Sequence, residues 1–291
     1  MEQNTQVQLT TKSLFAKDEV KQKFQELLGK RAPAFMTSVL QIISQSKELA
    51  KADPHSVYHA AAVAATLDLP INQNLGFAYI VAYFDKKQNK YIAQFQMGWK
   101  GFVQLAQRTG QFQSISVTHI TDKDTIKGNR LSGYEFEFAD KPGSVVGYAA
   151  NFRLLNGFEK TLYMTNEELR AHGLRFSQTF KKGFGLWNDD FHSMASKTVL
   201  KQLLSKFAPL SVEMQQAVTL DQALIKNEKG DDYEYPDNEQ ETGAEEVDKE
   251  AERINLLLSD CKTVAEVEAI QKQAPEFPES LFDQRKNELS K

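Results

Sequence analysis

The sequence predicts an α+β protein in which helices come first, antiparallel strands follow and further helices close the core. Apolar residues between residues 17 and 69 recur at helical spacing, whereas from residue 75 they alternate with a period of two. Further along, the dipeptide Asn156-Gly157 separates two strand-like runs. This dipeptide is favoured in two-residue β-hairpin turns, so it predicts that the two runs pair in an antiparallel manner.

The helical region divides at residues that typically begin or end helices. The first segment carries its apolar residues on one side and ends at Gly29, which suits a helix C-terminus. Pro33 can open a second helix, and Asp53 with Pro54 provides an N-cap and a first-turn proline for a third. We expect the third helix, which is rich in alanine, to end before Pro70.

The strands are predicted from alternation. Residues 75–84 and 91–97 flank the polar stretch DKKQNK and form a predicted hairpin. Other strand-like runs lie at 114–121, 132–138 and 145–155, and the last is expected to pair with the run after Gly157. Further elements are predicted from caps and periodicity: a short helix from Thr165 to Gly173 with Glu168 completing a capping box, a long amphipathic helix over 188–207, and a helix over 211–224.

Charge is distributed unevenly, although the net charge is only −4. Residues 1–227 carry 27 Lys and Arg against 20 Asp and Glu, residues 228–252 carry 2 against 12, and residues 253–291 carry 6 against 7. A basic body is compatible with a polyanionic partner such as nucleic acid. The acidic stretch has almost no branched aliphatic residues, so it is predicted to be disordered.

These patterns divide the chain into four parts: an N-terminal helical arm (1–29), a core (30–227), an acidic linker (228–252) and a small helical module (253–291). No apolar run approaches the roughly 20 residues of a membrane-spanning helix, and no signal peptide is evident. Cys261 is the only cysteine, which excludes an intramolecular disulfide and a multi-cysteine zinc site. We therefore expect a cytoplasmic protein without membrane contact.

The first candidate binding surface is the segment GWKGFVQLAQRTGQ, residues 98–111. Lys100, Gln104 and Arg108 follow one another at i+4 spacing and share one side of a helix, while Trp99 lies on another side. No Asp or Glu occurs from residue 86 to residue 121, whereas ordinary solvent-exposed faces mix charges of both signs. Lys and Arg neutralise phosphates and Gln donates to phosphate or sugar, so this face is a candidate for contact with a nucleic-acid backbone.

Two further stretches combine cations with aromatic rings or helical spacing. RFSQTFKKGFGLWND, residues 175–189, interleaves Arg175, Lys181 and Lys182 with aromatic residues that include Trp187. Such interleaving is typical of single-strand binding, although at least half of these rings are expected in the core. Lys197 and Lys201 lie one turn apart on the long helix, where lysines also suit the helix dipole.

Enzyme signatures are missing from the sequence. There is no G-x-x-x-x-G-K-[ST] phosphate loop and no G-x-S-x-G nucleophile motif. His55 and His59 have i+4 spacing without an evident third metal ligand. Asp122 and Asp124 could hold a metal ion as in a nuclease, which keeps a metal-dependent nuclease as an alternative function. We expect no cofactor and no enzymatic activity.

Three stretches together resemble the RecT family of phage and prophage single-strand DNA annealing proteins. They are LDLPINQNLGFAYIVAYF (67–84), MGWKGFVQLAQRTGQ (97–111) and WNDDFHSMASKTVLKQLLSKFAPLSVEMQQAVTLD (187–221), and the resemblance covers roughly residues 30–225. It implies an annealing core with a curved antiparallel sheet packed on a helix. It also implies sequence-nonspecific binding of single-stranded DNA and ATP-independent annealing of complementary strands in phage homologous recombination.

The resemblance further implies partners and site residues. The partners are single-stranded DNA and the annealed duplex intermediate, copies of the same chain in a ring or helical filament, a phage exonuclease and a host single-strand-binding protein. The family motifs cover Trp99, Lys100, Arg108, Trp187, Lys197 and Lys201, whereas Arg175, Lys181 and Lys182 rest on the basic and aromatic pattern alone. The resemblance does not cover the acidic linker and the module at 253–291. From the acidic run itself we expect that the linker competes with DNA for the basic surface or that the module binds a partner, with a solubilising spacer as the alternative. A phage structural assembly protein is the remaining alternative.

Overall fold

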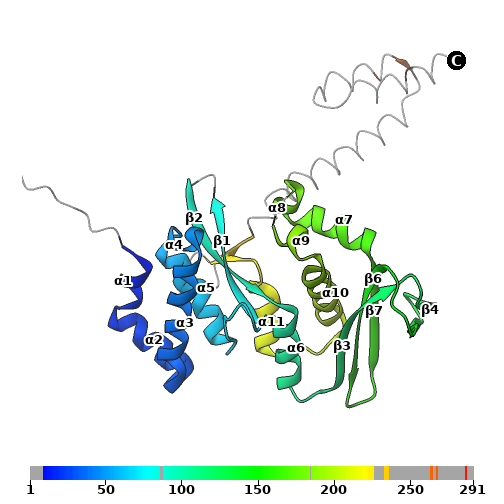
Figure 1. Cartoon of the computed structure of the whole chain (residues 1–291), viewed down its shortest axis with the longest axis horizontal. Helices are drawn as coiled ribbons and strands as arrows, with labels where there is room; N and C mark the ends of the chain where they lie inside the picture. Colours follow the sequence, from blue (N-terminus) through cyan, green and yellow to red (C-terminus); the bar gives the residue numbers. More distant parts are fainter. Residues whose placement is uncertain are drawn as a thin grey trace, which may run out of the picture. The chain divides into compact units, whose positions relative to one another are not determined.

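The structure is a computed structural model that describes residues 9–85, 88–183, 185–225 and 233–235, with residues 263, 264, 267 and 286 further on. The chain divides into two units, Met1–Pro236 and Asp237–Lys291. In the first unit helices precede, interrupt and follow antiparallel strands, which confirms the predicted α+β class (Figure 1). Its helices are α1 (Thr11–Phe15), α2 (Asp18–Leu28), the 3-10 helix η1 (Gly29–Arg31), α3 (Ala32–Gln45), α4 (Lys47–Ala50), α5 (Pro54–Thr66), α6 (Trp99–Arg108), α7 (Asn166–Phe176), α8 (Gln178–Lys181), α9 (Leu186–Asp189), α10 (Phe191–Phe207) and α11 (Val212–Leu220).

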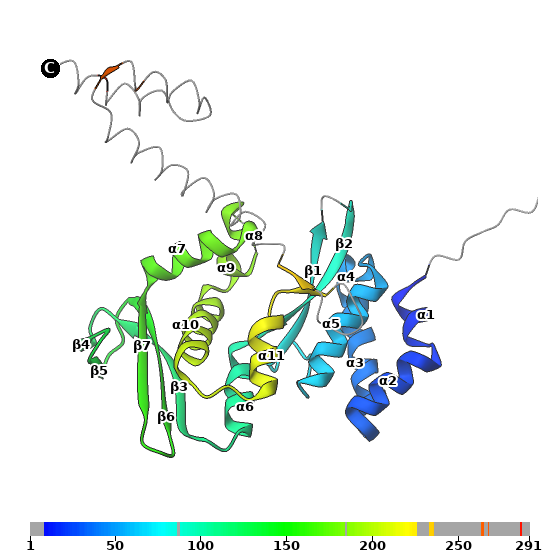
Figure 2. The same cartoon turned by 180° about the vertical axis from the view of Figure 1, so that it is seen from behind.

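The strands form small antiparallel sheets. Strands β3 (Phe112–Thr121), β6 (Val145–Leu154) and β7 (Glu159–Thr165) make a three-stranded sheet in the order β3-β6-β7. Three further antiparallel pairs are β1 (Ala78–Asp85) with β2 (Lys90–Met97), β4 (Thr125–Asn129) with β5 (Gly133–Glu137), and β8 (Leu224–Ile225) with β9 (Tyr233–Glu234). Helix α10 packs across the three-stranded sheet, as both views show (Figures 1 and 2).

The N-terminal helices bear out most of the caps that the sequence predicts. Gly29 has a positive φ of 56° and ends α2, as expected. Phe24 of α2 is fully buried against rings of Phe15 and Tyr58, so α2 closes over α1 and α5. Helix α1 was not predicted, because five residues are too few to show a period; Thr10 caps it with a reciprocal capping box.

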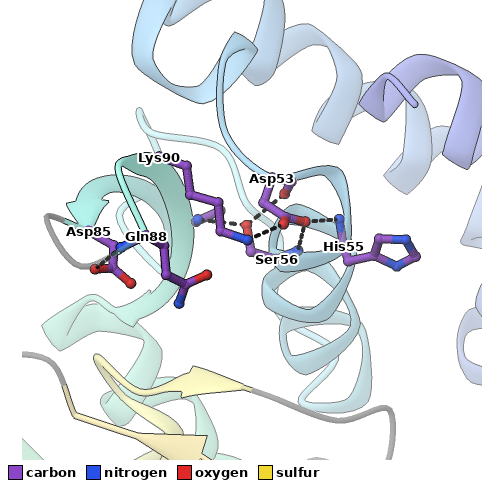
Figure 3. Close-up of polar contacts among 7 residues, drawn as sticks. Asp53, His55, Ser56, Asp85, Gln88 and Lys90 are labelled. Carbon is purple, nitrogen blue, oxygen red and sulfur yellow. Dashed lines mark hydrogen bonds and ion pairs between the residues drawn. The ribbon is translucent and has the colours of Figure 1, made fainter. Parts of the chain in front are cut away.

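Asp53 joins the start of α5 to the β1-β2 hairpin (Figure 3). Its Oδ1 accepts hydrogen bonds from the His55 and Ser56 N–H groups at 2.8 and 3.4 Å, which makes it the predicted N-cap. Its Oδ2 accepts from Lys90 Nζ at 2.8 Å, and the Ser56 hydroxyl accepts from the Ala93 N–H at 2.8 Å. Burial alone would raise the pKa of Asp53, but the hydrogen bonds from Lys90 and the two N–H groups lower it.

Three helix boundaries differ from the prediction. The helix expected over 211–224 ends at Leu220, because Gln222 has a positive φ of 71° and Leu224 belongs to β8. Helix α7 has the predicted capping box of Thr165 and Glu168 but continues through Gly173 to Phe176. At Gly173 an added Cβ would lie 2.9 Å from the Trp187 ring and 3.0 Å from Phe180. This glycine therefore allows α7 to pack closely against the two rings and does not end the helix. The expected helix over 188–207 is broken at Asp190, whose side chain caps α10 by accepting from the Ser193 N–H at 3.1 Å.

The run at 132–138 does not join the main sheet as an independent strand. Its residues form β5, which pairs with β4, a strand that the alternation did not predict. All five residues of β4 are exposed, and only Ile126 is apolar. The sequence of this strand therefore shows no apolar alternation. The β4-β5 hairpin nevertheless contacts β7 through the Tyr134 and Phe136 rings, which lie 5.7 and 5.9 Å from the Tyr163 ring.

A buried carboxylate connects the end of β2 with α10 and α11. Asp221 follows α11, and its Oδ1 accepts from the Met97 N–H at 2.9 Å and from Lys197 Nζ at 2.8 Å. Its Oδ2 accepts from Lys201 Nζ at 2.7 Å. Burial by itself would raise the pKa of Asp221, but the charges of Lys197 and Lys201 hold that pKa below its usual range.

Several predictions fall on residues outside the described part of the chain. The acidic linker (228–252) has only residues 233–235 described, and the module at 253–291 only Thr263, Val264, Val267 and Lys286. In that second unit the Val267 N–H donates to the Thr263 carbonyl at 3.4 Å, a helical i+4 bond. Within the described residues, no helix is both long enough and apolar enough to cross a membrane.

We predict that Asp221→Asn strongly destabilises the fold. The Lys197 side chain is only 8% exposed, and the substitution leaves its charge buried without a counter-charge. Loss of one partner of such a pair costs about 3–5 kcal/mol of unfolding free energy, which urea denaturation measures. Asp221→Leu/Lys197→Met should recover only part of the loss, because Lys201 and the Met97 N–H still lose their acceptor. An Asp221→Asn protein as stable as the wild type would contradict the pairing.

The lowered pKa of Asp221 also predicts a dependence of stability on pH. A carboxyl with a depressed pKa in the folded state contributes stability above its unfolded pKa and loses this contribution as the pH falls through the folded pKa. The wild type should therefore lose more unfolding free energy than Asp221→Asn when the pH falls below about 4. Parallel losses in urea titrations of the two proteins would remove Asp221 from the acid response.

Candidate nucleic-acid interface

Helix α6 lies close against the start of the β1 strand because two glycines allow the approach. An added Cβ on Gly98 would lie 2.0 Å from the Gly76 carbonyl oxygen, and one on Gly101 would lie 2.2 Å from the Phe77 carbonyl oxygen. The Gly98 N–H donates to the same Phe77 oxygen at 2.9 Å. Any other residue at these two positions would push α6 away from the hairpin.

The amphipathic pattern of α6 separates a buried side from a polar side, as predicted. Phe102, Leu105 and Ala106 belong to the core, whereas Lys100, Gln107 and Arg108 are exposed. The polar side carries no acid, since none occurs between residues 86 and 121. This helix therefore presents cations and amides together on one surface.

Helix α6 lines a hollow of about 520 Å³, which lies within the range of about 300–1,000 Å³ that is usual for ligand sites. We call it the α6 hollow; its lining residues are Phe77, Trp99, Lys100, Val103, Gln104, Gln107 and Arg108. Lys100 Nζ lies 5.8 Å from the centre of the Trp99 ring and forms no ion pair with any described residue. Half-buried aromatic and aliphatic groups thus form its floor, with charge at its rim.

Arg108 and Gln104 differ in how they are held. Arg108 donates to the carbonyl oxygens of Leu67 and Asp68 at 2.8 and 2.7 Å, which fixes the end of α6 to the end of α5. These bonds use two of its five N–H donors. Gln104 Oε1 is buried and has no hydrogen-bond partner among the described residues. The sequence pattern therefore brings four predicted residues, Trp99, Lys100, Gln104 and Arg108, to one surface.

A second hollow of about 340 Å³ lies between the β1-β2 hairpin and α10, and Trp99 lines both hollows. Its lining includes Tyr79, Asp190 and Lys197. Burial raises the pKa of Tyr79, and the nearby Asp190 charge adds to that effect, so this phenol stays protonated. Of the predicted cations Lys100, Arg108, Lys197 and Lys201, only Lys197 lines this hollow, and Lys197 is already paired with Asp221.

The remaining predicted residues lie elsewhere. Trp187 is 6% exposed, and its ring stacks on Phe180 at 5.7 Å. The Arg175 guanidinium lies 5.1 Å from the Phe176 ring, and Lys181 and Lys182 are exposed at the end of α8. Helices α8 and α6 lie at opposite ends of α10 in both views (Figures 1 and 2). The structure therefore does not bring these four residues to the α6 hollow.

The two aspartates considered as metal ligands hold loops together. Asp124 accepts from the Thr121 N–H at 2.7 Å and from the Ala139 N–H at 2.9 Å, and these hydrogen bonds lower its pKa. Asp122 accepts from the Ser144 N–H at 3.0 Å. Among the described residues, no group of three or more His, Cys, Asp or Glu is placed to hold a metal ion.

Comparison with known proteins identifies the family. The profile described as "RecT family" matches residues 33–240. The uncharacterized protein YqaK of Bacillus subtilis (strain 168) is 47% identical over 211 residues, which cover 72% of this chain and 71% of YqaK. Protein RecT of Escherichia coli (strain K12) is 28% identical over 210 residues, 68% of this chain and 76% of RecT. The matched region contains the α6 hollow and the Asp221 ion pairs, and the chain belongs to the RecT family.

Proposed function

We propose that this protein binds single-stranded DNA without sequence preference through the α6 hollow and anneals complementary strands without a nucleotide cofactor. Membership of the RecT family supports single-strand annealing in DNA recombination in general. Annealing without ATP, assembly into oligomers and the assignment of the DNA-binding residues belong to this proposal. The observation that carries it is the polar side of α6, where cations and amides surround half-buried rings and no described acid lines the hollow; the Asp68 carboxylate lies 4.0 Å from Arg108 at the end of the helix.

Different side chains of the α6 hollow would contact the DNA backbone and the bases. Lys100 and the remaining donors of Arg108 would bind phosphates, and the half-buried Trp99 and Phe77 rings would stack against an unpaired base. Neither kind of contact selects a base, so the Watson–Crick edges remain free to test a second strand. Specificity then comes from base pairing rather than from the protein.

We assign Lys197 and Lys201 a supporting role in this proposal. Both Nζ atoms bond Asp221, which also accepts from the Met97 N–H immediately before Gly98 and α6. Their charges position the start of α6 rather than meet phosphate directly. Buried Trp187 similarly holds α7, α8 and α9 together, while exposed Lys182 would contact more distant phosphates.

We further propose that the protein acts in the cytoplasm as an oligomer on DNA, in phage homologous recombination. A subunit with a few phosphate contacts binds weakly alone, whereas neighbouring subunits on one strand bind with a high effective concentration. The acidic linker and the module at 253–291 would engage a phage exonuclease or a host single-strand-binding protein. Deleting residues after 236, which keeps β9, should abolish such partner binding and leave annealing intact.

Annealing of two labelled complementary oligonucleotides tests the proposed function. We expect acceleration over the protein-free rate without any nucleotide cofactor, and none for a non-complementary pair. Gel analysis of the same samples should show intact strands. Magnesium-dependent cleavage that disappears in Asp122→Ala would instead favour a nuclease, and self-association without DNA affinity would favour a structural assembly protein.

Assembly on DNA is tested separately by light scattering. With oligonucleotides several times longer than one binding site, we expect particles much heavier than one 33.0 kDa chain plus DNA. The reason is that subunits bound side by side on one strand stabilise one another. Only one protein chain per long oligonucleotide at saturation would contradict the oligomer while leaving the binding surface untouched.

Lys100→Gln should weaken DNA binding and reduce its dependence on salt. Each phosphate contact to single-stranded DNA contributes about −0.7 to the slope of log K against log salt. Removing one contact should make the slope shallower by about that amount, measured by fluorescence anisotropy between low and moderate salt. Lys17→Gln, an exposed lysine beside α2, is the matched control. An unchanged slope in Lys100→Gln would remove Lys100 from the interface.

A further inference from the structure

A third hollow combines cations and aromatic rings away from α6. Its volume is about 550 Å³, and α7, β7, the last turns of α10 and the β4-β5 hairpin enclose it. We call it the α7 pocket. Its cations include Lys160, Arg175 and Lys206, and its rings include Tyr163, Phe176 and Phe207. Among these residues the sequence pattern pointed only to Arg175 and Phe176.

The local fold explains why these side chains converge. Glu168, His172, Arg175 and Phe176 recur at helical spacing, so one face of α7 forms a wall of the pocket. Consecutive residues of β7, the edge strand of the three-stranded sheet, form another wall. Helix α10 packs on both α6 and β7, so it separates this pocket from the α6 hollow.

Positive charge in the α7 pocket is not balanced by the acid that lines it. Glu168 is bound by Arg130 and also accepts from the Thr165 N–H at 2.9 Å as part of the capping box. Lys206 Nζ donates to the neutral Gln202 side chain at 3.3 Å, and Lys160 Nζ lies 5.1 Å from the Phe207 ring centre. Within the described residues, neither lysine is paired with a carboxylate.

His172 lies beside these cations. Burial first, and then the charges of Lys201, Arg175 and Lys206, together lower its pKa to about 4. The imidazole is therefore neutral at physiological pH, and it lies 4.6 Å from the Phe176 ring. An anion bound beside these cations would oppose their effect and raise the His172 pKa.

We infer that the α7 pocket is a second nucleic-acid site, which holds one nucleotide of single-stranded DNA with its phosphate at Lys160 and Lys206 and its base against the rings. Volume, cations and aromatic surface together fit a nucleotide, whereas an acidic peptide would use the cations alone. This inference rests on the proposed function. The nucleotide can belong to the strand bound at α6 or to the incoming complementary strand, and the experiment distinguishes the two.

The test compares the full-length Lys160→Gln/Lys206→Gln protein with Lys17→Gln/Lys23→Gln, which removes the same charge from exposed positions at α2. Fluorescence anisotropy of a labelled oligonucleotide measures the first strand, and stopped-flow annealing to a pre-bound strand measures the second. First-strand binding that is at least fivefold weaker, with a salt slope shallower by about 0.7 because one phosphate contact is lost, assigns the pocket to the first strand. First-strand affinity within twofold of the control variant, with annealing at least tenfold slower than in the control, assigns the pocket to the complementary strand.

Binding, salt slope and annealing that all match the control pair would overturn the inference. So would polyglutamate that competes as well as an oligonucleotide of equal charge, because the rings would then contribute nothing. If the wild type binds DNA but does not anneal, the proposed function fails, yet a changed salt slope in Lys160→Gln/Lys206→Gln still supports the pocket.

A local readout separates ligand binding from a change in fold. Histidine NMR signals, with His172 assigned by His172→Asn, should show a pKa near 4 in the free protein that rises when a short oligonucleotide binds. The rise should vanish in Lys160→Gln/Lys206→Gln if its phosphate contact is lost. A His172 pKa unaffected by saturating oligonucleotide would contradict a phosphate in the pocket.

Discussion

Asp221 connects three parts of the core that are far apart in the sequence. Its carboxylate accepts hydrogen bonds from Lys197 and Lys201 on α10 and from the Met97 N–H at the end of β2. Buried ions are costly unless they are paired and hydrogen-bonded, so this arrangement is stable only when all the partners are in place. The end of β2, α10 and the end of α11 therefore have to meet in one geometry.

The candidate interface depends on that geometry. Gly98 follows Met97 directly, and the α6 helix starts at the next residue. Because Gly98 and Gly101 let α6 approach the Gly76 and Phe77 carbonyls, the Trp99 ring is held between the α6 hollow and the hollow next to α10. Cations at the rim are then presented by a rigid helix rather than by a flexible loop, which suits a surface that must keep a strand extended.

Local patterns in the sequence predict much of this architecture. The caps at Asp53 and Thr165, the end of α2 at Gly29 and the β6-β7 hairpin depend on neighbouring residues, and all are present. The polar side of α6 was also predictable, because its i+4 spacing and its lack of acids are visible in the sequence.

Features that depend on distant residues were not predictable. Lys197 and Lys201 have the spacing of solvent-exposed lysines, and their partner Asp221 lies 24 and 20 residues away. Gly173 resembles a helix end until the Trp187 and Phe180 rings are placed against it. The α7 pocket likewise requires strand β7, two helices and a hairpin to converge, so Lys160 and Lys206 carry no signal in the sequence.

Lysine footprinting tests the central claim most directly, that the polar side of α6 contacts DNA. Acetylation of each lysine, quantified by mass spectrometry with and without saturating single-stranded DNA, reports which amines the strand covers. We predict strong protection of Lys100, no change at exposed Lys17 and Lys23, and low reactivity of buried Lys197 in both states. Equal reactivity of Lys100 with and without saturating DNA would contradict the account.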